Sequence, residues 1–200
     1  MMKVEKTESG YAIERPLEAL DEFVIDFVDV LEEAGIDYVI VSGYVSILFG
    51  RSRSSEDVDI IIKRMSAKEF ARAWDVLTNG FECIITNDAS SAYADYLMDK
   101  LAIRFARNGE VVPNIEIKFP ATAIDAWTLK NGITAKINGR RLNISPIELQ
   151  IAFKLYLGSD KDIEDAKHLY LLLKDYINHE VLEERVRNFR QEKTFRRFLK

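Results

Sequence analysis

The chain has 200 residues, of which 48% are hydrophobic and 30% charged, and a formal net charge of -5, so a long disordered, collagen-like or low-complexity chain is excluded. Its single cysteine excludes an intrachain disulfide, and with only two histidines a zinc site of the Cys/His type is hardly constructible. Because no apolar run approaches the roughly 20 residues of a membrane span and residues 1–10 lack the apolar region of a signal peptide, we expect a cytoplasmic protein with no membrane partner.

The residues before about position 145 predict a mixture of helices and strands. Apolar residues at helical spacing predict helices, and short β-branched or alternating runs bounded by turn residues predict strands. In chain order we expect a helix over 17–31, a strand over 38–41, a tight turn at Ser42-Gly43, a short helix over 44–49, a strand over 57–62, a helix over 66–77, an extended piece over 81–85 and a helix over 92–100. Two β-hairpins follow, over 101–119 and 133–144, each with an Asn-Gly turn.

From Ser145-Pro146 onward the pattern is purely helical. We expect helices over 147–157, over 162–174 and from about 179 to the end. The chain therefore divides into an α+β domain at 1–145, with a mixed sheet and helices, and a helical C-terminal subdomain at 146–200. The last twenty residues hold seven basic and three acidic residues, which leaves two interpretations open: a solvated helix face or a patch for nucleic-acid phosphate.

Three carboxylates have the spacing of a metal site. Asp57 and Asp59 are two residues apart on a predicted strand, so both side chains lie on one face of the sheet. Glu116, on a later strand, joins that face if the two strands are neighbours. Three carboxylates on adjacent strands suit Mg²⁺ and suggest phosphoryl or nucleotidyl transfer. The alternative for Glu116 is an ion pair with Lys118 or Arg104 across the hairpin.

A corner suited to phosphate precedes these carboxylates. The predicted strand over 38–41 ends at Ser42-Gly43 and a helix begins at once, so free backbone N–H groups face a point where an anion can bind. Arg51 and Arg53, together with the serines around them, lie between this corner and the carboxylates and add donors for phosphate oxygens.

The segment from Val41 to Ile60 resembles the signature of the DNA-polymerase-β-like nucleotidyltransferase superfamily, in which a pair of small residues after one strand precedes an acidic pair on the next. It is most similar to the branch found in abortive-infection toxin systems, which has an Arg-x-Thr-x-Asp-x-Asp pattern. Arg53, Ser55, Asp57 and Asp59 fall on that pattern, with Ser55 in place of the usual Thr. The stretches 145–154 and 161–166 are similar to the helical segment of the same branch.

This resemblance implies a Mg²⁺-dependent enzyme that moves an NMP from an NTP to an acceptor hydroxyl and releases pyrophosphate. Asp57, Asp59 and Glu116 would be the catalytic residues and would hold two Mg²⁺ ions. The nucleotide would be bound by Ser42, Gly43, Arg53, Ser55, Lys154, Asp162 and Asp165. The acceptor stays open: a tRNA or another RNA, a protein, or a small molecule such as an aminoglycoside. A toxin role would bring an antitoxin partner.

Two residues depart from the family pattern. The family usually has Gly-Gly or Gly-Ser at the corner, whereas this chain has Ser42 at the first position, and Tyr44 is expected to add bulk beside it. These departures favour a second interpretation: a catalytically inactive protein of the same fold that binds a nucleotide, RNA or protein as a regulator. Asp162 and Asp165, together with Glu164, also have a second interpretation, as first-turn acids that complement a helix dipole, and a purely structural role is open for Lys154 as well.

Overall fold

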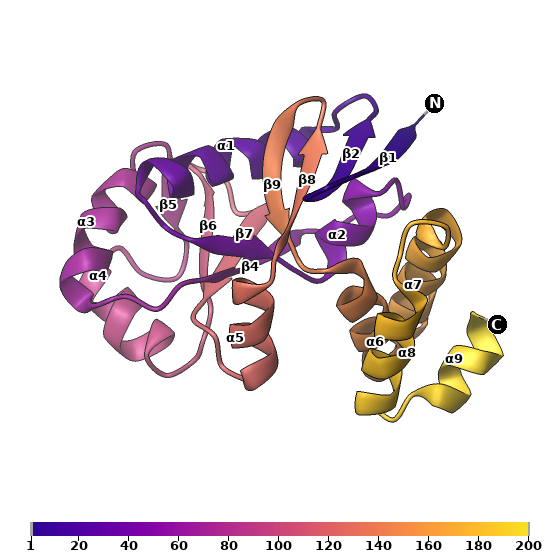
Figure 1. Ribbon diagram of the computed structural model, residues 1–200. Helices are drawn as coiled ribbons and strands as arrows, with labels where there is room; N and C mark the ends of the chain where they lie inside the picture. The colour runs from indigo at the N-terminus through magenta and orange to yellow at the C-terminus, as the bar shows by residue number, and fades with distance from the viewer. Residues whose placement is uncertain (1, 200) are drawn as a thin grey trace.

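The computed structural model describes residues 2–199, and its centre is one mixed sheet of nine strands in the order β1-β2-β8-β9-β3-β4-β7-β6-β5 (Figure 1). The strands are β1 (Lys3–Thr7), β2 (Gly10–Glu14), β3 (Tyr38–Ile40), β4 (Asp57–Ile62), β5 (Phe81–Cys83), β6 (Ile103–Arg107), β7 (Asn114–Lys118), β8 (Ile133–Ile137) and β9 (Arg140–Ile144). Three neighbouring pairs are parallel, β2 with β8, β3 with β9 and β4 with β7, and the others are antiparallel. The expected α+β class with a mixed sheet is confirmed.

Helices flank this sheet and form a group of their own at the end of the chain. They are α1 (Ala19–Glu33), α2 (Gly43–Leu48), α3 (Ala67–Leu77), α4 (Ala89–Ser91), the π-helical turn η1 (Ala92–Leu97), α5 (Ala123–Lys130), α6 (Ile147–Leu157), α7 (Asp160–Leu173), α8 (His179–Asn188) and α9 (Glu192–Phe198). Helices α6 to α9 gather beyond α2, and α5 stands opposite α6 (Figure 1). Among residues 2–199, no helix has both the length and the apolar character needed to cross a membrane.

Local sequence signals explain several of the helix starts. Ser66 and Glu69 form a reciprocal capping box at the start of α3, since each side chain accepts a hydrogen bond from the other residue's backbone N–H. Thr122 and Asp125 do the same for α5. These caps satisfy N–H groups that have no partner inside a helix, so they determine where each helix begins.

The sequence-based expectations are wrong in four places. The hairpin of β1 and β2 was not expected, because its stability comes from a long-range parallel pairing in which Gly10 lies beside Thr134 of β8. Helix α5 was also missed. The expected helix over 92–100 is the shorter π-helical turn η1. The last expected helix is broken into α8 and α9, because Arg190 adopts a left-handed conformation with φ of 57°.

The link between β9 and α6 is the place where the chain passes from the sheet to the final helices. The proposed boundary near residue 145 falls in this link. Buried side chains on both sides of it, such as Ile60 on β4 and Ile151 on α6, belong to one hydrophobic cluster. The helical segment therefore shares a core with the sheet, and its division into a separate subdomain stays a prediction.

The side chain of Tyr44 points into this core, contrary to the expectation that it adds bulk beside the corner. It is fully buried, and its hydroxyl donates a 2.8 Å hydrogen bond to Oδ1 of Asp21. The two terminal nitrogens of Arg15 donate to the same carboxylate at 2.6 and 2.8 Å. Asp21 is itself fully buried, so these donors offset the cost of removing its charge from water.

We expect the substitution Tyr44→Phe to lower the free energy of unfolding by about 1–2 kcal/mol, because it removes one donor from a buried carboxylate without leaving a cavity. Urea denaturation measures this change, with Tyr176→Phe, at an exposed position, as the control. An equal effect of the two substitutions would contradict the role assigned to this hydrogen bond.

Candidate functional site

The corner between β3 and α2 is built on an unusual backbone conformation at Ser42. Strand β3 ends at Ile40, and α2 begins at Gly43, as expected for a strand, a tight turn and a helix. Ser42 has φ of 62° and ψ of -134°, which glycine adopts readily and residues with a Cβ avoid. The signature that residues 41–60 resemble usually has glycine at this position, and this backbone conformation is a physical reason for that preference.

A glutamine that the sequence analysis missed supports this strained turn. Gln150 of α6 donates from Nε2 to the carbonyl oxygen of Ser42 at 2.5 Å, and its Oε1 accepts from the Ser145 hydroxyl at 2.9 Å. The nitrogen and the oxygen of the Gln150 side-chain amide therefore both have hydrogen-bond partners, which matters because this side chain is only 4% exposed. The sequence did contain a signal for this role. Gln150 and Lys154 are the two polar residues among the buried residues of α6, which are otherwise apolar.

The carboxylates lie on adjacent strands, as the spacing predicted. Strand β4 pairs in parallel with β7, so that Asp59 lies directly beside Glu116, and Asp57 beside Asn114. Asp57 is exposed and accepts a weak hydrogen bond of 3.4 Å from the Ser55 hydroxyl. Ser55 thus lies with the carboxylates rather than at the corner.

The environment of Asp59 disfavours its charge. Burial raises the pKa of Asp59 above its ordinary value, and the negative charges of Glu116 and Asp57 act in the same direction. A hydrogen bond from the Ser42 hydroxyl and the positive charge of Lys118 oppose these effects. A bound cation would remove the repulsion among the carboxylates and favour the ionised form.

Glu116 has a second neighbour on the other side of its strand. Arg104 of β6 lies directly across from it, and the guanidinium contacts Oε1 through Nε, at 2.6 Å, and through a terminal nitrogen. The pairing with Arg104 that the sequence left open is therefore present. Among residues 2–199, no three Asp, Glu, His or Cys side chains converge closely enough to form a ready metal cluster.

A cluster of buried charges lies behind the corner. Asp165 of α7 is fully buried, and its Oδ1 lies 3.1 Å from Nε of Arg53 and 3.4 Å from Nε of Arg51. Its Oδ2 lies 3.1 Å from Nζ of Lys154, which also contacts Oδ1 of Asp162 at 2.6 Å. Three cations thus meet two carboxylates, leaving a net positive charge of about one inside the protein. The alternative of a first-turn acid fits Asp162, which lies in the first turn of α7, but not Asp165, which is fully buried beyond that turn.

The cluster touches the corner through one guanidinium. A side-chain carbon at Gly43 would collide with the terminal nitrogen of Arg53, so any larger residue there would displace this guanidinium. On the other side of the cluster, burial opposes the charge of Asp162, but hydrogen bonds from Lys154 and Ser159 outweigh it and lower the pKa of Asp162. The structure thus brings Gly43, Arg53 and the three α6–α7 residues together.

A cleft of about 480 Å³ opens in front of Ser42 and Asp59, between α5 and α6. Lys118 of β7 faces it from the sheet, and Phe153 and Tyr156 face it from α6. None of these three was assigned to the site from the sequence. A cavity of this size, lined by both apolar and polar side chains, is typical of a small-molecule site.

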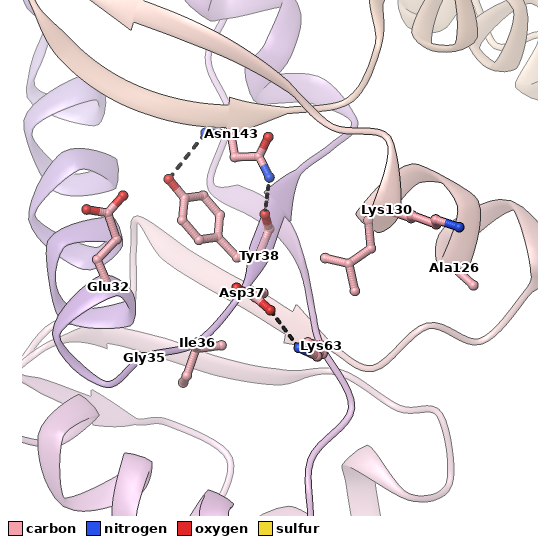
Figure 2. A pocket seen from close by; sticks show the side chains of 10 residues that line it. Glu32, Gly35, Ile36, Asp37, Tyr38, Lys63, Ala126, Lys130 and Asn143 are labelled. Carbon is pink, nitrogen blue, oxygen red and sulfur yellow. Dashed lines mark hydrogen bonds and ion pairs between the residues drawn. The ribbon is translucent and has the colours of Figure 1, made fainter. Parts of the chain in front are cut away.

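A larger cavity, of about 700 Å³, lies at the opposite end of β3 (Figure 2). Several of its polar groups are paired with one another. Lys63 and Asp37 form an exposed ion pair of 2.9 Å, and Asn143 donates to the backbone oxygen of Tyr38 at 2.6 Å (Figure 2). It contains none of the carboxylates or cations of the corner, so it does not contribute to the candidate site.

No protein-family model and no curated protein matches the sequence. Solved structures do resemble the fold. An antigenic nucleotidyltransferase-like protein from Paracoccidioides brasiliensis matches with a TM-score of 0.52 and 17% identity, over 92% of this chain and 94% of that chain. ANT(2'')-Ia, in complex with adenylyl-2''-tobramycin, matches with a TM-score of 0.50 and 13% identity, over 86% and 97%.

At these identities the similarity shows the fold. The chain is an α+β protein with the fold of nucleotidyltransferases, and the expectation from the Val41–Ile60 signature is confirmed at that level. The narrower assignment to the abortive-infection branch stays a prediction, because the two structures do not bear on it.

We expect the substitution Ser42→Gly to give a protein more stable than Ser42→Ala by about 0.5–1 kcal/mol. Both variants lose the hydroxyl, but only glycine relieves the positive φ, and this gain exceeds the extra freedom of glycine in the unfolded chain. Thermal or urea unfolding measures the difference. At Ser54, where φ is negative, the order of the glycine and alanine variants should be reversed. The same order at both positions would contradict strain at Ser42.

Proposed function

We propose that this protein is a nucleotidyltransferase that moves an NMP from an NTP to an acceptor hydroxyl. The observation that carries the proposal is the pairing of β4 with β7, which sets Asp59 beside Glu116 at the edge of a cleft that also contains the corner at Ser42. In this arrangement the carboxylates would hold the metal next to the groups that would bind phosphate, as nucleotidyl transfer requires.

The donor set fits Mg²⁺. Asp57, Asp59 and Glu116 are hard oxygen donors, and the mutual repulsion that disfavours the charge of Asp59 is the environment that a divalent cation stabilises. Asp57 and Asp59 would hold the metal first, and Glu116 would complete a site for two ions. When bound, Mg²⁺ neutralises the phosphates and lowers the pKa of a coordinated hydroxyl.

The buried cations would receive the triphosphate. The Nε atoms of Arg51 and Arg53 are buried and have no acceptor in hydrogen-bond geometry, although Asp165 lies within ion-pair distance of both. The terminal nitrogen of Arg53 beside Gly43 would donate to a phosphate oxygen at the corner, while the buried Nε atoms stay turned toward Asp165. Lys154 would add charge from α6, while Asp162 and Asp165 would orient it. The backbone N–H groups after Ser42 would bind the same oxygens.

The cleft between α5 and α6 would hold the nucleoside. Tyr156 is 55% exposed at its edge, and its ring lies 5.9 Å from that of Phe153, also on α6. Together these rings offer an aromatic face of the kind on which a base stacks. Lys118 lines the same cleft from the sheet side.

In the proposed reaction, the acceptor hydroxyl oxygen attacks the α-phosphorus, and the bond from that phosphorus to the oxygen bridging to the β-phosphate breaks. Pyrophosphate leaves with the bonding electrons and the nucleotide remains on the acceptor. Glu116 would receive the hydroxyl proton. The cations at the corner would stabilise the charge that develops on the departing pyrophosphate.

The acceptor is proposed from chemistry and analogy. ANT(2'')-Ia is described in complex with adenylyl-2''-tobramycin, which makes a hydroxyl-bearing small molecule one candidate class. A tRNA or another RNA is a second candidate class, and a protein hydroxyl is a third. The Arg-x-Ser-x-Asp-x-Asp motif at 53–59 supports the abortive-infection branch, with a toxin role and an antitoxin partner.

A second candidate function is a catalytically inactive regulator that binds a nucleotide, RNA or protein through the same fold. Two observations favour it: the glycine-type backbone occupied by Ser42, and the engagement of Glu116 by Arg104. Nucleotide binding without pyrophosphate release would support this function over the first.

We expect Asp57→Ala and Asp59→Ala to abolish transfer while leaving the fold intact, because Asp57 is exposed, Asp59 is half-buried, and neither belongs to the hydrophobic core. The measurement is transfer from each α-³²P-labelled NTP, with Mg²⁺, to cellular RNA, to a protein extract and to aminoglycosides. Asp37→Ala, which removes an exposed carboxylate near the other cavity, is the matched control.

Label with the native protein and with Asp37→Ala, but with neither Asp57→Ala nor Asp59→Ala, would support the enzyme, and the labelled fraction would identify the acceptor class. Undiminished labelling by either of the latter two variants would exclude the carboxylate assignment. Labelling by none of the proteins, together with measurable NTP binding, would support the regulator.

We expect Tyr156→Ala to raise the Kd for NTP about three- to tenfold, the loss of about 0.5–1.5 kcal/mol of stacking. Isothermal titration in the presence of Mg²⁺ measures it. Tyr176→Ala removes another partly exposed tyrosine, 40% exposed and outside the cleft, and should leave the Kd unchanged. Equal Kd values for the two variants would mean that the base does not lie against Tyr156.

A further inference from the structure

Three charged side chains stand in a row across neighbouring strands. Asp59 on β4 is paired with Glu116 on β7, and Glu116 is paired in turn with Arg104 on β6. Residues paired directly across a sheet point to the same face, and neighbouring strands are about 4.8 Å apart. Glu116 therefore stands between an aspartate on one side and an arginine on the other.

The contact with Arg104 draws Glu116 away from the aspartates. Two guanidinium nitrogens contact the same oxygen, Oε1, and Glu116 is held on the β6 side of its strand. This agrees with the absence, among residues 2–199, of any cluster of three potential metal-binding side chains, although the backbone brings Glu116 next to Asp59.

Both side chains can leave this position. The side chain of Arg104 is 49% exposed and that of Glu116 17% exposed, and the exposed contact contributes little to stability. No carboxylate other than Glu116 forms an ion pair with Arg104 within residues 2–199. The carboxylate thus has two competing partners of positive charge: the guanidinium beside it and any cation held by Asp57 and Asp59.

We propose that Arg104 is a positioning residue that withholds Glu116 from the aspartate pair until a divalent cation bound there draws the carboxylate across. The proposal rests on the proposed function only in taking Asp57 and Asp59 as a cation site. It makes completion of the three-carboxylate site a consequence of binding rather than a property of the free protein. The guanidinium opposes the first cation and becomes free when Glu116 moves.

The experiment is a titration of the metal-free protein with Mn²⁺, followed by electron paramagnetic resonance of the unbound ion, without nucleotide. We expect Arg104→Met to bind Mn²⁺ about tenfold more tightly than the native protein, because a competing positive charge is removed and Glu116 is released. Arg104→Lys, which keeps the charge but loses the paired contact, should lie between the two.

Arg107→Met is the matched control. Arg107 is on the same strand, pairs with Asp26 at 2.6 Å, and points to the opposite face. Its removal changes the net charge equally but should alter the Mn²⁺ affinity by less than about twofold. Unfolding curves show whether each variant is folded.

A double-mutant cycle tests whether the effect passes through Glu116. In a Glu116→Gln background, Arg104→Met should tighten Mn²⁺ binding clearly less than in the native background, since no carboxylate is left to release. Equal effects in both backgrounds would overturn the proposal and leave only general repulsion. An unchanged Mn²⁺ affinity for Arg104→Met would overturn it as well.

The Asp59→Ala variant separates this failure from failure of the proposed function. Mn²⁺ binding that depends on Asp59 but is unaffected by Arg104→Met would retain the metal site and reject the role of Arg104. If neither the native protein nor Arg104→Met binds Mn²⁺ in an Asp59-dependent way, both the positioning role and the metal site are rejected.

Discussion

The parallel pairing of β4 with β7 is the constraint on which the candidate site depends. Five consecutive residue pairs, from Asp57 with Asn114 to Ile61 with Lys118, determine which side chains can act together. A shift of one residue would place Glu116 beside an apolar neighbour and turn the acidic face toward the core. The apolar residues that alternate with the carboxylates, Val58 and Ile60 among them, are buried, so the core itself opposes such a shift.

The buried carboxylate of Asp165 connects the loop before β4 with the final helices. Its charge is tolerable inside the protein only because Arg51, Arg53 and Lys154 surround it. The two arginines belong to the loop between α2 and β4, whereas Asp165 and Lys154 belong to α7 and α6. The helical segment is therefore one wall of the candidate site, and Gln150 reinforces this by holding the Ser42 carbonyl.

Local sequence patterns were sufficient for the parts of the site that depend on a single element. The two-residue spacing of Asp57 and Asp59 on a strand and the turn at Ser42-Gly43 follow from short-range periodicity. Other features depend on which distant strands become neighbours. One is the pairing of the β1–β2 hairpin with β8, and another is the contact of Glu116 with Arg104 rather than with Asp59. The conformation of Ser42 was also beyond a local prediction, because contacts from α6 support an otherwise unfavourable φ.

Two features separate the free protein from a preformed site: the unfavourable backbone conformation of Ser42 and the ion pair of Glu116 with Arg104. The free energy of each is small. The sparsely populated backbone conformation of Ser42 costs about 1–3 kcal/mol, and a half-exposed ion pair such as Arg104–Glu116 contributes at most about 1 kcal/mol. A triphosphate with its cations makes several charge-assisted hydrogen bonds, each worth about 1.5–3 kcal/mol. Ligand binding can therefore supply more energy than the release of Glu116 from Arg104 requires. The free protein would then differ from a competent site by one side-chain movement on an otherwise rigid sheet.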